Sequence, residues 1–418
     1  MKIITGIRRC GKSFLLFTLY KDYLLNEGVT KDCFVELALD RKAHVKYRNP
    51  NELYDYVLRK TKDAEKRYYI FIDEIQLSYK VKNEEVDERL VPEEDREMLY
   101  TTFYDILNDL VARKNLDIYV TGSNSKMLSK DIVTNFRDRG SEIKVYPISF
   151  KEFYPVSGME KADALEEYLT YGGMPLAVLE KNETEKRKYL KGLHKRVYIK
   201  DIVERYKLKD DEVLDALINA LSSSVGSLTN PHNLANAAST LMKRTTSDNT
   251  IKNYLEYLEE AYLFVSAQRY DIKGKRYFEN TLKYYSMDTG LRNAKLNFCQ
   301  QEKSHLMENM IFIELVRRGY SVDVGIVELV LVKDGKKQQS QYEIDFIVNT
   351  GREKVYIQSA LNVDTAAKKD QETFSLRNSG DFFRKIVIID GNSKPWTDED
   401  GIMYMGVIPF LLEEETII

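Results

Sequence analysis

The sequence has few cysteines, and they follow no recognisable spacing. The three, Cys10, Cys33 and Cys299, are odd in number and far apart, so they form neither a disulfide framework nor a metal-ligand pattern. The four histidines are scattered as well and add no metal-binding cluster. This cysteine usage is typical of the reducing cytosol, and we therefore expect a cytoplasmic protein.

Long apolar runs and an excess of charge of one sign are also missing. No run approaches the roughly 20 apolar residues that span a bilayer. Gly6, Arg8, Arg9 and Lys12 interrupt the stretch where a signal peptide would need an apolar core. We therefore expect no membrane association. A formal net charge of −3 gives no global basic field for nucleic acid, so any such surface has to be local.

The length and the pattern of apolar residues indicate several domains. A chain of 418 residues exceeds one ordinary core, and about two to three domains are expected. In the N-terminal part, short apolar runs alternate with helical patterns, which indicates a parallel α/β sheet. The expected strands are residues 2–5, 33–37, 68–72 and 117–121. We predict three domains, at residues 1–192, 193–298 and 299–418.

A phosphate-binding motif stands near the N-terminus. Residues 6–13, Gly-Ile-Arg-Arg-Cys-Gly-Lys-Ser, fit G-x-x-x-x-G-K-[ST] at every fixed position, after an apolar strand and before a helical pattern. The alternative, an ordinary glycine turn before a helix, is disfavoured by this context. Lys12 is expected to reach the β- and γ-phosphates, and the Ser13 hydroxyl to bind Mg²⁺. The residues expected to hold ATP are Gly6, Arg8, Arg9, Cys10, Gly11, Lys12, Ser13 and Phe14.

Two acids follow a buried strand about sixty residues after this motif. The run Tyr68-Tyr69-Ile70-Phe71-Ile72 ends in Asp73-Glu74. Asp73 is expected to hold Mg²⁺, directly or through water. Glu74 is expected to be the general base that polarises the attacking water. An apolar strand with two acids at its end is usually only a solvated strand end, but the preceding phosphate motif favours the functional interpretation.

A third strand ends in polar residues, Thr121-Gly122-Ser123-Asn124-Ser125. In a parallel sheet, residues at the carboxyl ends of strands face the ligand crevice. Ser123 and Asn124 are therefore candidates to sense the γ-phosphate or to orient water. The alternative is turn chemistry, because Gly, Ser and Asn are all turn formers.

Four segments together resemble a known family. Residues 6–13, 72–76, 121–125 and 147–153 (Pro-Ile-Ser-Phe-Lys-Glu-Phe) are similar to the prokaryotic AAA-type ATPases near the archaeal ATPase clade. The resemblance implies an α/β fold of three parts: an AAA-type P-loop NTPase domain, a winged-helix middle domain and a C-terminal α/β restriction-endonuclease-like domain. It also implies an arginine finger, for which Arg139 is the closest match and Arg137 the second. A finger acting on a neighbouring subunit would require a homo-oligomer; the alternative is a surface arginine paired with Asp138 or Glu142.

The sequence departs from this family at its start. Family members usually carry some two dozen residues before the first strand, and that segment helps to cover the nucleotide base. Here Gly6 follows Met1 closely, and we expect weaker nucleotide affinity for this reason. Two functions are therefore considered. The first is an ATPase switch that acts on DNA or on a DNA-bound partner, and the second is an interaction protein that binds ATP with little turnover.

The middle part has the element order of a winged helix. A helix is expected after Asn230-Pro231 and a second from about Ser247, followed by strands near residues 263–270 and 277–285. A local basic face would contact DNA phosphates without reading bases. Its candidate residues are Lys243, Arg244, Lys252, Lys273, Lys275, Arg276 and Lys283. The alternative is a winged helix used for packing, with solvated lysines.

The C-terminal part resembles PD-(D/E)XK nucleases without their complete set of active residues. Glu308 in a helical stretch and Asp345 on a strand occupy two of the expected positions. Gln358 stands where the second acid is needed, and Ala360 where the lysine is needed. Because a carboxamide is a poor Mg²⁺ ligand and alanine donates nothing, we predict an inactive nuclease-like domain. The alternative is that these acids are ordinary surface residues.

Overall fold

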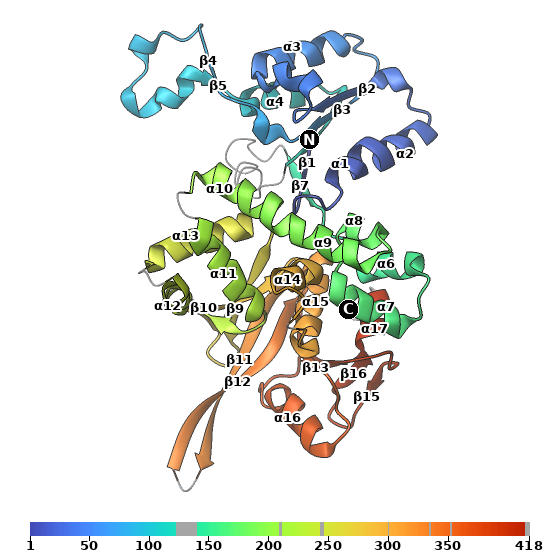
Figure 1. Cartoon of the computed structure of the whole chain (residues 1–418), viewed down its shortest axis with the longest axis vertical. Helices are drawn as coiled ribbons and strands as arrows, with labels where there is room; N and C mark the ends of the chain where they lie inside the picture. Colours follow the sequence, from blue (N-terminus) through green and yellow to red (C-terminus); the bar gives the residue numbers. More distant parts are fainter. Residues whose placement is uncertain are drawn as a thin grey trace. The chain divides into compact units, whose positions relative to one another are not determined.

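A computed structural model describes residues 1–122, 140–208, 211–242, 246–299, 301–333, 336–351 and 353–413. Its contacts divide the chain into two compact units (Figure 1). The first consists of Met1–Val145 with Glu260–Tyr262, and the second of Tyr146–Glu259 with Leu263–Ile418. These units meet at Val145–Tyr146. This division by contacts does not test the predicted domain boundaries at residues 192 and 298, which stay a prediction. No described helix has the length and apolar character needed to cross a membrane.

The first unit contains a parallel sheet of five strands in the order β2–β3–β6–β1–β7. Its strands are β1 (Lys2–Thr5), β2 (Phe34–Ala38), β3 (Tyr68–Asp73), β6 (Leu116–Thr121) and β7 (Ser141–Lys144). A separate hairpin consists of β4 (Val81–Lys82) and β5 (Tyr100–Thr101). The helical segments are α1 (Lys12–Phe14), η1 (Leu15–Tyr20), α2 (Lys21–Asn26), η2 (Lys31–Cys33), η3 (Lys42–Arg48), α3 (Pro50–Lys60), η4 (Ile75–Leu77), η5 (Glu88–Leu90), η6 (Glu93–Leu99) and α4 (Phe103–Val111).

The central strands of this sheet are apolar on both faces because helices cover both. Ile70 and Ile72 of β3 pack into one buried cluster with residues of α3 and α4, such as Leu53 and Leu107. Phe71 points to the opposite face and packs in a second cluster with Leu16. Successive side chains of a strand alternate between faces, so a strand buried on both faces reads as a continuous apolar run. The expected parallel α/β sheet is therefore present.

The second unit contains a mixed sheet of nine strands in the order β15–β16–β14–β13–β12–β11–β9–β10–β8. Its strands are β8 (Leu228–Thr229), β9 (Phe264–Asp271), β10 (Arg276–Ser286), β11 (Ser321–Lys333), β12 (Lys336–Asn349), β13 (Lys354–Ala360), β14 (Arg384–Ile389), β15 (Trp396–Thr397) and β16 (Met403–Gly406). Its helices are α6 (Phe150–Ser157), α7 (Lys161–Tyr171), α8 (Pro175–Leu179), α9 (Glu183–Leu193), η8 (His194–Ile199), α10 (Lys200–Tyr206), α11 (Asp211–Ser223), α12 (Pro231–Met242), α13 (Asp248–Glu260), α14 (Thr289–Lys295), α15 (Lys303–Arg317), α16 (Ala366–Arg377) and α17 (Val407–Leu412).

The elements expected for a winged helix are present in order, but the hairpin is not a separate wing. Helices α12 and α13 are followed by the antiparallel pair β9–β10. Strand β9 also pairs in parallel with β11 at Val324–Ile326. The hairpin is therefore part of the nine-stranded sheet, and the winged-helix description of this region stays a prediction.

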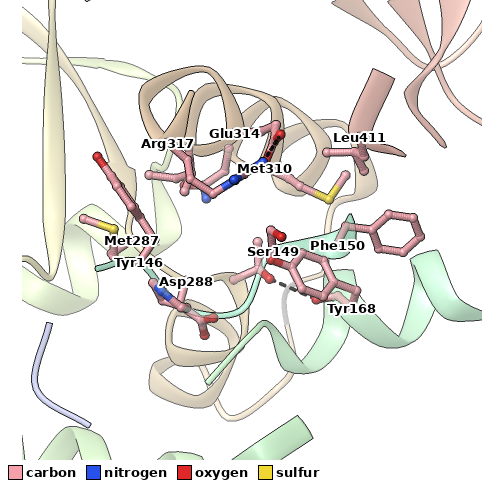
Figure 2. A pocket seen from close by; sticks show the side chains of 14 residues that line it. Tyr146, Ser149, Phe150, Tyr168, Met287, Asp288, Met310, Glu314, Arg317 and Leu411 are labelled. Carbon is pink, nitrogen blue, oxygen red and sulfur yellow. Dashed lines mark hydrogen bonds and ion pairs between the residues drawn. The ribbon is translucent and has the colours of Figure 1, made fainter. Parts of the chain in front are cut away.

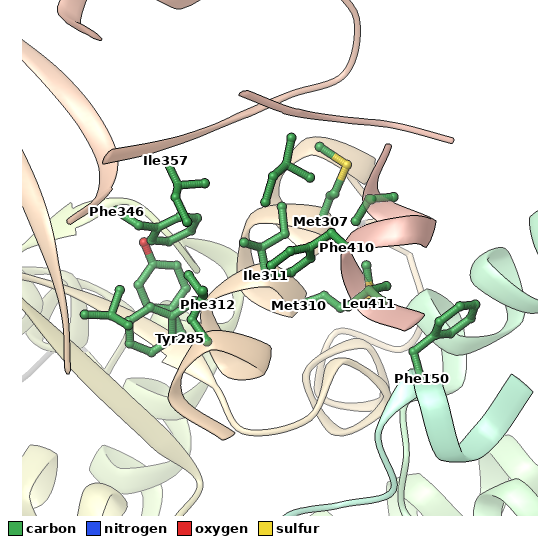
Figure 3. Close-up of a cluster of buried hydrophobic side chains, with 14 of the residues drawn as sticks. Phe150, Tyr285, Met307, Met310, Ile311, Phe312, Phe346, Ile357, Phe410 and Leu411 are labelled. Atoms are coloured by element: carbon green, nitrogen blue, oxygen red, sulfur yellow. The ribbon is translucent and has the colours of Figure 1, made fainter. Parts of the chain in front are cut away.

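Helix α15 lies within an extensive apolar cluster of the second unit (Figure 3). Its Phe312 ring stacks on Tyr285 of β10, with ring centroids 4.0 Å apart. Phe346 of β12 joins them, with its centroid 6.1 Å from each of the two rings. Through these contacts α15 holds strands β10 and β12 on one core.

The distal ends of β11 and β12 run beyond the other strands of the unit (Figure 1). Strand β9 pairs with β11 only at Val324–Ile326, whereas the β11–β12 pairing continues to Lys333. On this two-stranded extension Val330 and Val332 are 63% and 69% exposed. A two-stranded ribbon of this kind has no second layer to cover its apolar side chains.

Candidate nucleotide-binding site

The phosphate loop, residues 6–13, lies between β1 and α1 as the motif requires. Gly6 and Gly11 adopt φ angles of 136° and 103°, which residues with a Cβ rarely tolerate. A Cβ on Gly6 would lie 2.1 Å from the carbonyl oxygen of Val145. Helices α1, η1 and α2 then run without a break from Lys12 to Asn26. The expected strand–loop–helix arrangement is confirmed.

The Lys12 side chain folds back over the phosphate loop. Only 5% of Lys12 is exposed, and its ammonium donates hydrogen bonds to the carbonyl oxygens of Gly6, at 2.8 Å, and Ile7, at 3.0 Å. The charge is thus held at the mouth of the loop, at the start of a helix, where backbone N–H groups also favour an anion. This arrangement suits phosphate groups.

The carboxyl ends of β3 and β6 bring Asp73, Glu74 and Thr121 together. Thr121 donates its hydroxyl hydrogen to Oδ1 of Asp73 and accepts a hydrogen bond from the Glu74 backbone N–H at 3.2 Å. Asp73 is 6% exposed. The β3–β6 register explains the contact, because Ile72 pairs with Val120 and the next residues are therefore neighbours. Asp73 and Glu74 have the predicted placement, but the bridging role of Thr121 was not predicted.

Glu74 is held in an unusual backbone conformation. Its φ of 54° is in the left-handed region, where non-glycine residues are uncommon and often functional. Gln76 donates a hydrogen bond from Nε2 to the Glu74 carboxylate. Burial raises the pKa of Glu74, the charge of Asp73 raises it further, and Lys12, Gln76 and Arg8 partly oppose this. A carboxylate with a raised pKa is a better proton acceptor at neutral pH.

Of the remaining predicted site residues, some lie in the described part of the chain and others lie outside it. Ser13 and Phe14 are exposed at the start of α1 and Cys10 is buried, with its Sγ 3.5 Å from the Val145 carbonyl oxygen. Burial raises the pKa of the Cys10 thiol, so Cys10 is not a reactive thiolate. Arg8 is partly buried and Arg9 exposed in the loop. Ser123, Asn124, Arg137 and Arg139 lie outside the described residues, and their roles stay predictions.

Mg²⁺ and ATP fit the residues present in this site. Ser13 and Asp73 offer hydroxyl and carboxylate oxygens, the ligand types that Mg²⁺ prefers. The close approach of Gly6 to Val145 and the positive φ of Gly11 leave the backbone of the loop open to phosphate oxygens. Because these groups lie at the carboxyl edge of a parallel sheet, they occupy the usual position for a ligand in this class of fold.

Comparison with known proteins identifies the domain. A family model described as an AAA domain matches residues 1–154, and a model of a domain of unknown function, DUF8612, matches residues 162–302. An uncharacterized protein of Haemophilus influenzae is 33% identical over 418 residues, which is 99% of this chain and 94% of the relative. The chain belongs to the family of this relative. Its N-terminal part is an AAA-type P-loop ATPase domain, in agreement with the resemblance seen in the sequence.

Further matches to the chain are more distant. An uncharacterized protein of Methanocaldococcus jannaschii is 30% identical over 389 residues, which is 88% of this chain and 76% of the relative. Among solved structures, the ORC1 protein of Aeropyrum pernix in complex with DNA covers 71% of this chain and 86% of its own, at 11% identity. Its TM-score is 0.26, and a likeness this weak carries no argument about fold or function.

The second unit brings the three predicted nuclease-like positions near one another. The Asp345 backbone N–H donates to Oε1 of Gln358 at 3.4 Å. Burial raises the pKa of Asp345, and the charge of Glu308 raises it further. Lys283, predicted as part of a basic surface, was placed wrongly: it is 3% exposed and pairs with Glu308. Local sequence did not reveal this because β10 enters the large sheet. Lys243 and Arg244 lie outside the described residues.

A small cavity in the second unit is too narrow for a ligand (Figure 2). Its volume of about 30 Å³ corresponds to about one water molecule. Asp288 lies in its wall and accepts hydrogen bonds from the backbone N–H groups of Gly173, at 2.6 Å, and Leu291, at 2.9 Å. Burial raises the pKa of Asp288 to about 6. We therefore interpret Asp288 as a structural link between the loop after α7 and the start of α14.

Proposed function

We propose that the first unit binds ATP with Mg²⁺ and hydrolyses it to ADP and phosphate. The observation that carries this proposal is the Thr121 bridge, which fixes Asp73 and Glu74 relative to each other at the carboxyl edge of the sheet. Thr121 lies on β6, the strand that pairs with the phosphate-loop strand β1. The metal-binding acid, the base and the phosphate loop are thus parts of one hydrogen-bonded sheet.

Each residue has a distinct task in this proposal. Lys12 and the loop N–H groups hold the phosphates, and Ser13 and Asp73 hold Mg²⁺. The metal ion would neutralise charge on the phosphate oxygens. Glu74 accepts a proton from the attacking water, and its raised pKa suits this task. Gln76 positions the Glu74 carboxylate through its hydrogen bond.

An ATPase assay on the purified full-length chain tests the assignment of Glu74. Glu74→Gln is expected to retain ATP binding and to lose turnover by about 10²-fold or more, because a carboxamide accepts no proton. Lys12→Ala is expected to lose binding itself, because it removes the ammonium from the loop. Glu27→Gln changes an exposed acid after α2 and serves as the matched control. Equal rates for wild type and Glu74→Gln would refute the base assignment.

The target of the ATPase is a separate part of the proposal. We propose DNA, or a partner bound to DNA, because Lys252, Lys273, Lys275 and Arg276 are exposed on α13 and around the β9–β10 turn. A second function, binding ATP with little turnover, is distinguished by the same assay: stoichiometric binding without phosphate release in the presence and absence of DNA would favour it. If Arg139 acts on the site of a neighbouring subunit, turnover per chain should rise with protein concentration. Turnover that is independent of concentration would contradict this role.

A further inference from the structure

A wide cleft lies among the helices of the second unit. Its volume is about 850 Å³, which is within the range of about 300–1,000 Å³ typical of small-molecule sites. One wall comes from the helical run of α9, η8 and α10, another from α11, and the rest from the end of α14 and the residues after it (Figure 1). All lining residues lie between positions 191 and 297, within the region that matches DUF8612.

The first wall departs from α-helical geometry where it faces the cleft. Residues 183–206 form one helical run, in which His194–Ile199 is a π-helix. A π-helical turn within a longer helix is rare and is frequently found at a functional site. Here this turn contributes His194, Lys195 and Ile199 to the lining of the cleft. The irregular geometry and the cleft therefore coincide.

The acids of the lining are accounted for by contacts within the fold. Oδ1 of Asp215 on α11 lies 2.5 Å from Nζ of Lys295 on α14, and Oε1 of Glu204 lies 3.6 Å from Nζ of Lys200 within α10. Two further acids stand in the first turn of α11, where the helix dipole stabilises negative charge. These are Asp211 and Glu212.

Two lysines of the lining are not accounted for in this way. Lys191 and Lys195 are exposed, four positions apart on the first wall, and both line the cleft. Within the described residues, neither forms an ion pair with an acid. Like charges at this spacing on one helical wall repel each other. An anion bound in the cleft would relieve this repulsion.

A buried histidine adds a neutral hydrogen-bonding group to the same wall. His194 is 6% exposed and is part of the lining. Burial lowers the pKa of His194 to about 4, the charge of Lys295 contributes to this, and Asp215 partly opposes it. The imidazole is therefore neutral at pH 7 and offers one N–H donor. A phosphate group carries up to about two negative charges at this pH, which matches two lysines better than a single carboxylate does.

We propose that this cleft binds a small phosphate-bearing molecule, whose phosphate is held by Lys191 and Lys195. The His194 ring donates a further hydrogen bond, and the apolar side chains of Ile199 and Val203 in the lining contact the rest of the molecule. This inference goes beyond the proposed ATPase and does not depend on it, because all lining residues belong to the second unit.

Calorimetric titration with inorganic pyrophosphate tests the proposal. The full-length chain carries Lys12→Ala, which removes the proposed phosphate site of the first unit, and one saturable site is expected to remain. Lys191→Gln with Lys195→Gln is expected to raise the Kd by about tenfold or more, because charge-assisted contacts are lost. Lys181→Gln with Lys188→Gln removes two exposed lysines that do not line the cleft. This control is expected to bind as its parent does.

A second variant tests the cleft itself without a change of charge. Ala216 of α11 is part of the lining and is partly buried. Ala216→Leu narrows the cleft, and leucine is a good helix former, so α11 is expected to persist. The Kd for pyrophosphate is expected to rise several-fold. Attraction of the anion to surface lysines alone would leave the Kd of this variant unchanged.

Each of four results would overturn the proposal. The first is the absence of saturable pyrophosphate binding to the Lys12→Ala chain. The second is an equal Kd for this chain with and without Lys191→Gln and Lys195→Gln, and the third is an unchanged Kd in Ala216→Leu, which would place the anion outside the cleft. The fourth is tighter binding of succinate than of pyrophosphate, because the site would then prefer carboxylates.

Discussion

The hydroxyl of Thr121 donates a hydrogen bond to the carboxylate of Asp73 across two neighbouring parallel strands. The same oxygen accepts the backbone N–H of Glu74. A single side chain on β6 therefore sets the orientation of the proposed metal ligand and the conformation of the residue after it. Because all three groups are at least partly buried, loss of this hydroxyl would leave polar groups without partners.

Thr121→Val is expected to reduce both stability and turnover. Valine has nearly the same shape but neither donates to Asp73 nor accepts from Glu74, at a cost of about 1–3 kcal/mol in the free energy of unfolding. Chemical denaturation and ATPase kinetics measure the two effects, and a lower kcat is expected. Thr121→Ser keeps the hydroxyl and is expected to stay close to wild type. Unchanged turnover in Thr121→Val would contradict a positioning role.

Gly6→Ala is expected to abolish nucleotide binding and to destabilise the first unit. The new Cβ would lie 2.1 Å from the Val145 carbonyl oxygen at a φ of 136°, so the phosphate loop would have to move. Gly28→Ala is the matched control, because Gly28 also has a positive φ but no atom within 4 Å of the added Cβ. It is expected to cost about 1–2 kcal/mol from backbone strain alone and to bind ATP normally. Binding of a fluorescent ATP analogue distinguishes the two variants.

The buried Asp288 is expected to make stability depend on pH. Its pKa is raised to about 6 by burial, against about 3.9 in an unfolded chain. The folded state therefore holds the proton more tightly, and this contribution is complete below about pH 4 and lost as the pH rises to about 6. The loss amounts to about 3 kcal/mol. Tyr168, Glu314 and Arg317 line the same cavity.

Asp288→Asn removes the titrating group. Its single side-chain oxygen keeps only one of the two bonds, because Gly173 donates to Oδ2 and Leu291 to Oδ1 of Asp288, and the loss of the other bond does not depend on pH. The difference in unfolding free energy, wild type minus variant, is expected to fall between about pH 4 and 6 and to stay constant above. The difference between wild type and variant is used because His194 also makes the free energy of unfolding depend on pH, in the opposite direction. Burial and the charge of Lys295 lower the pKa of His194 to about 4, so the stability that His194 contributes is lost as the pH falls. A pH-independent difference would refute the Asp288 assignment.

Binding to DNA is expected to depend steeply on salt if the exposed basic residues contact phosphates. Reversal of Lys273, Lys275 and Arg276 to Glu should weaken binding and reduce the slope of log K against log salt by about 3, since each contact releases a counterion. Lys181→Glu with Lys188→Glu alters two exposed lysines elsewhere in the unit and is the control. Fluorescence anisotropy with duplex DNA gives both quantities. If the chain does not bind duplex DNA even at low salt, the DNA-binding proposal is wrong and the region of α12, α13 and the β9–β10 hairpin serves only for packing.

The sequence predicted the strands that are buried on both faces, because they appear as continuous apolar runs. Strand β3 was expected at residues 68–72 and is observed at Tyr68–Asp73. Strand β7 (Ser141–Lys144) was not predicted, since it is a largely exposed edge strand with the polar sequence Ser-Glu-Ile-Lys. The pattern of apolar residues reveals a strand only where its side chains are buried. An exposed edge strand has few apolar residues and therefore gives no such pattern.

Residues whose roles depend on tertiary contacts were less accessible to sequence reasoning. The phosphate motif located Lys12 and Ser13, and the strand end located Asp73 and Glu74. Thr121 has no motif of its own, and its contact with Asp73 follows from the β3–β6 register. Lys283 was expected on a surface because lysine is seldom buried. The two acids that form ion pairs with Lys283 are Glu308 on α15 and Glu343 on β12. Nothing in the local sequence indicates that these elements lie beside β10.

The position of β1 within its sheet has a consequence for synthesis of the chain. The ribosome makes residues 2–5 before residues 119–121 and 141–144, which are their two neighbours in the sheet. The strand that carries the phosphate loop therefore stays unpaired until almost the whole unit has been translated and has emerged. Pairings this distant in sequence form slowly, and an apolar strand that waits for its partners is exposed to misassociation. We infer that β1, although it is made before both of its partner strands, is among the last strands of this sheet to reach its native place.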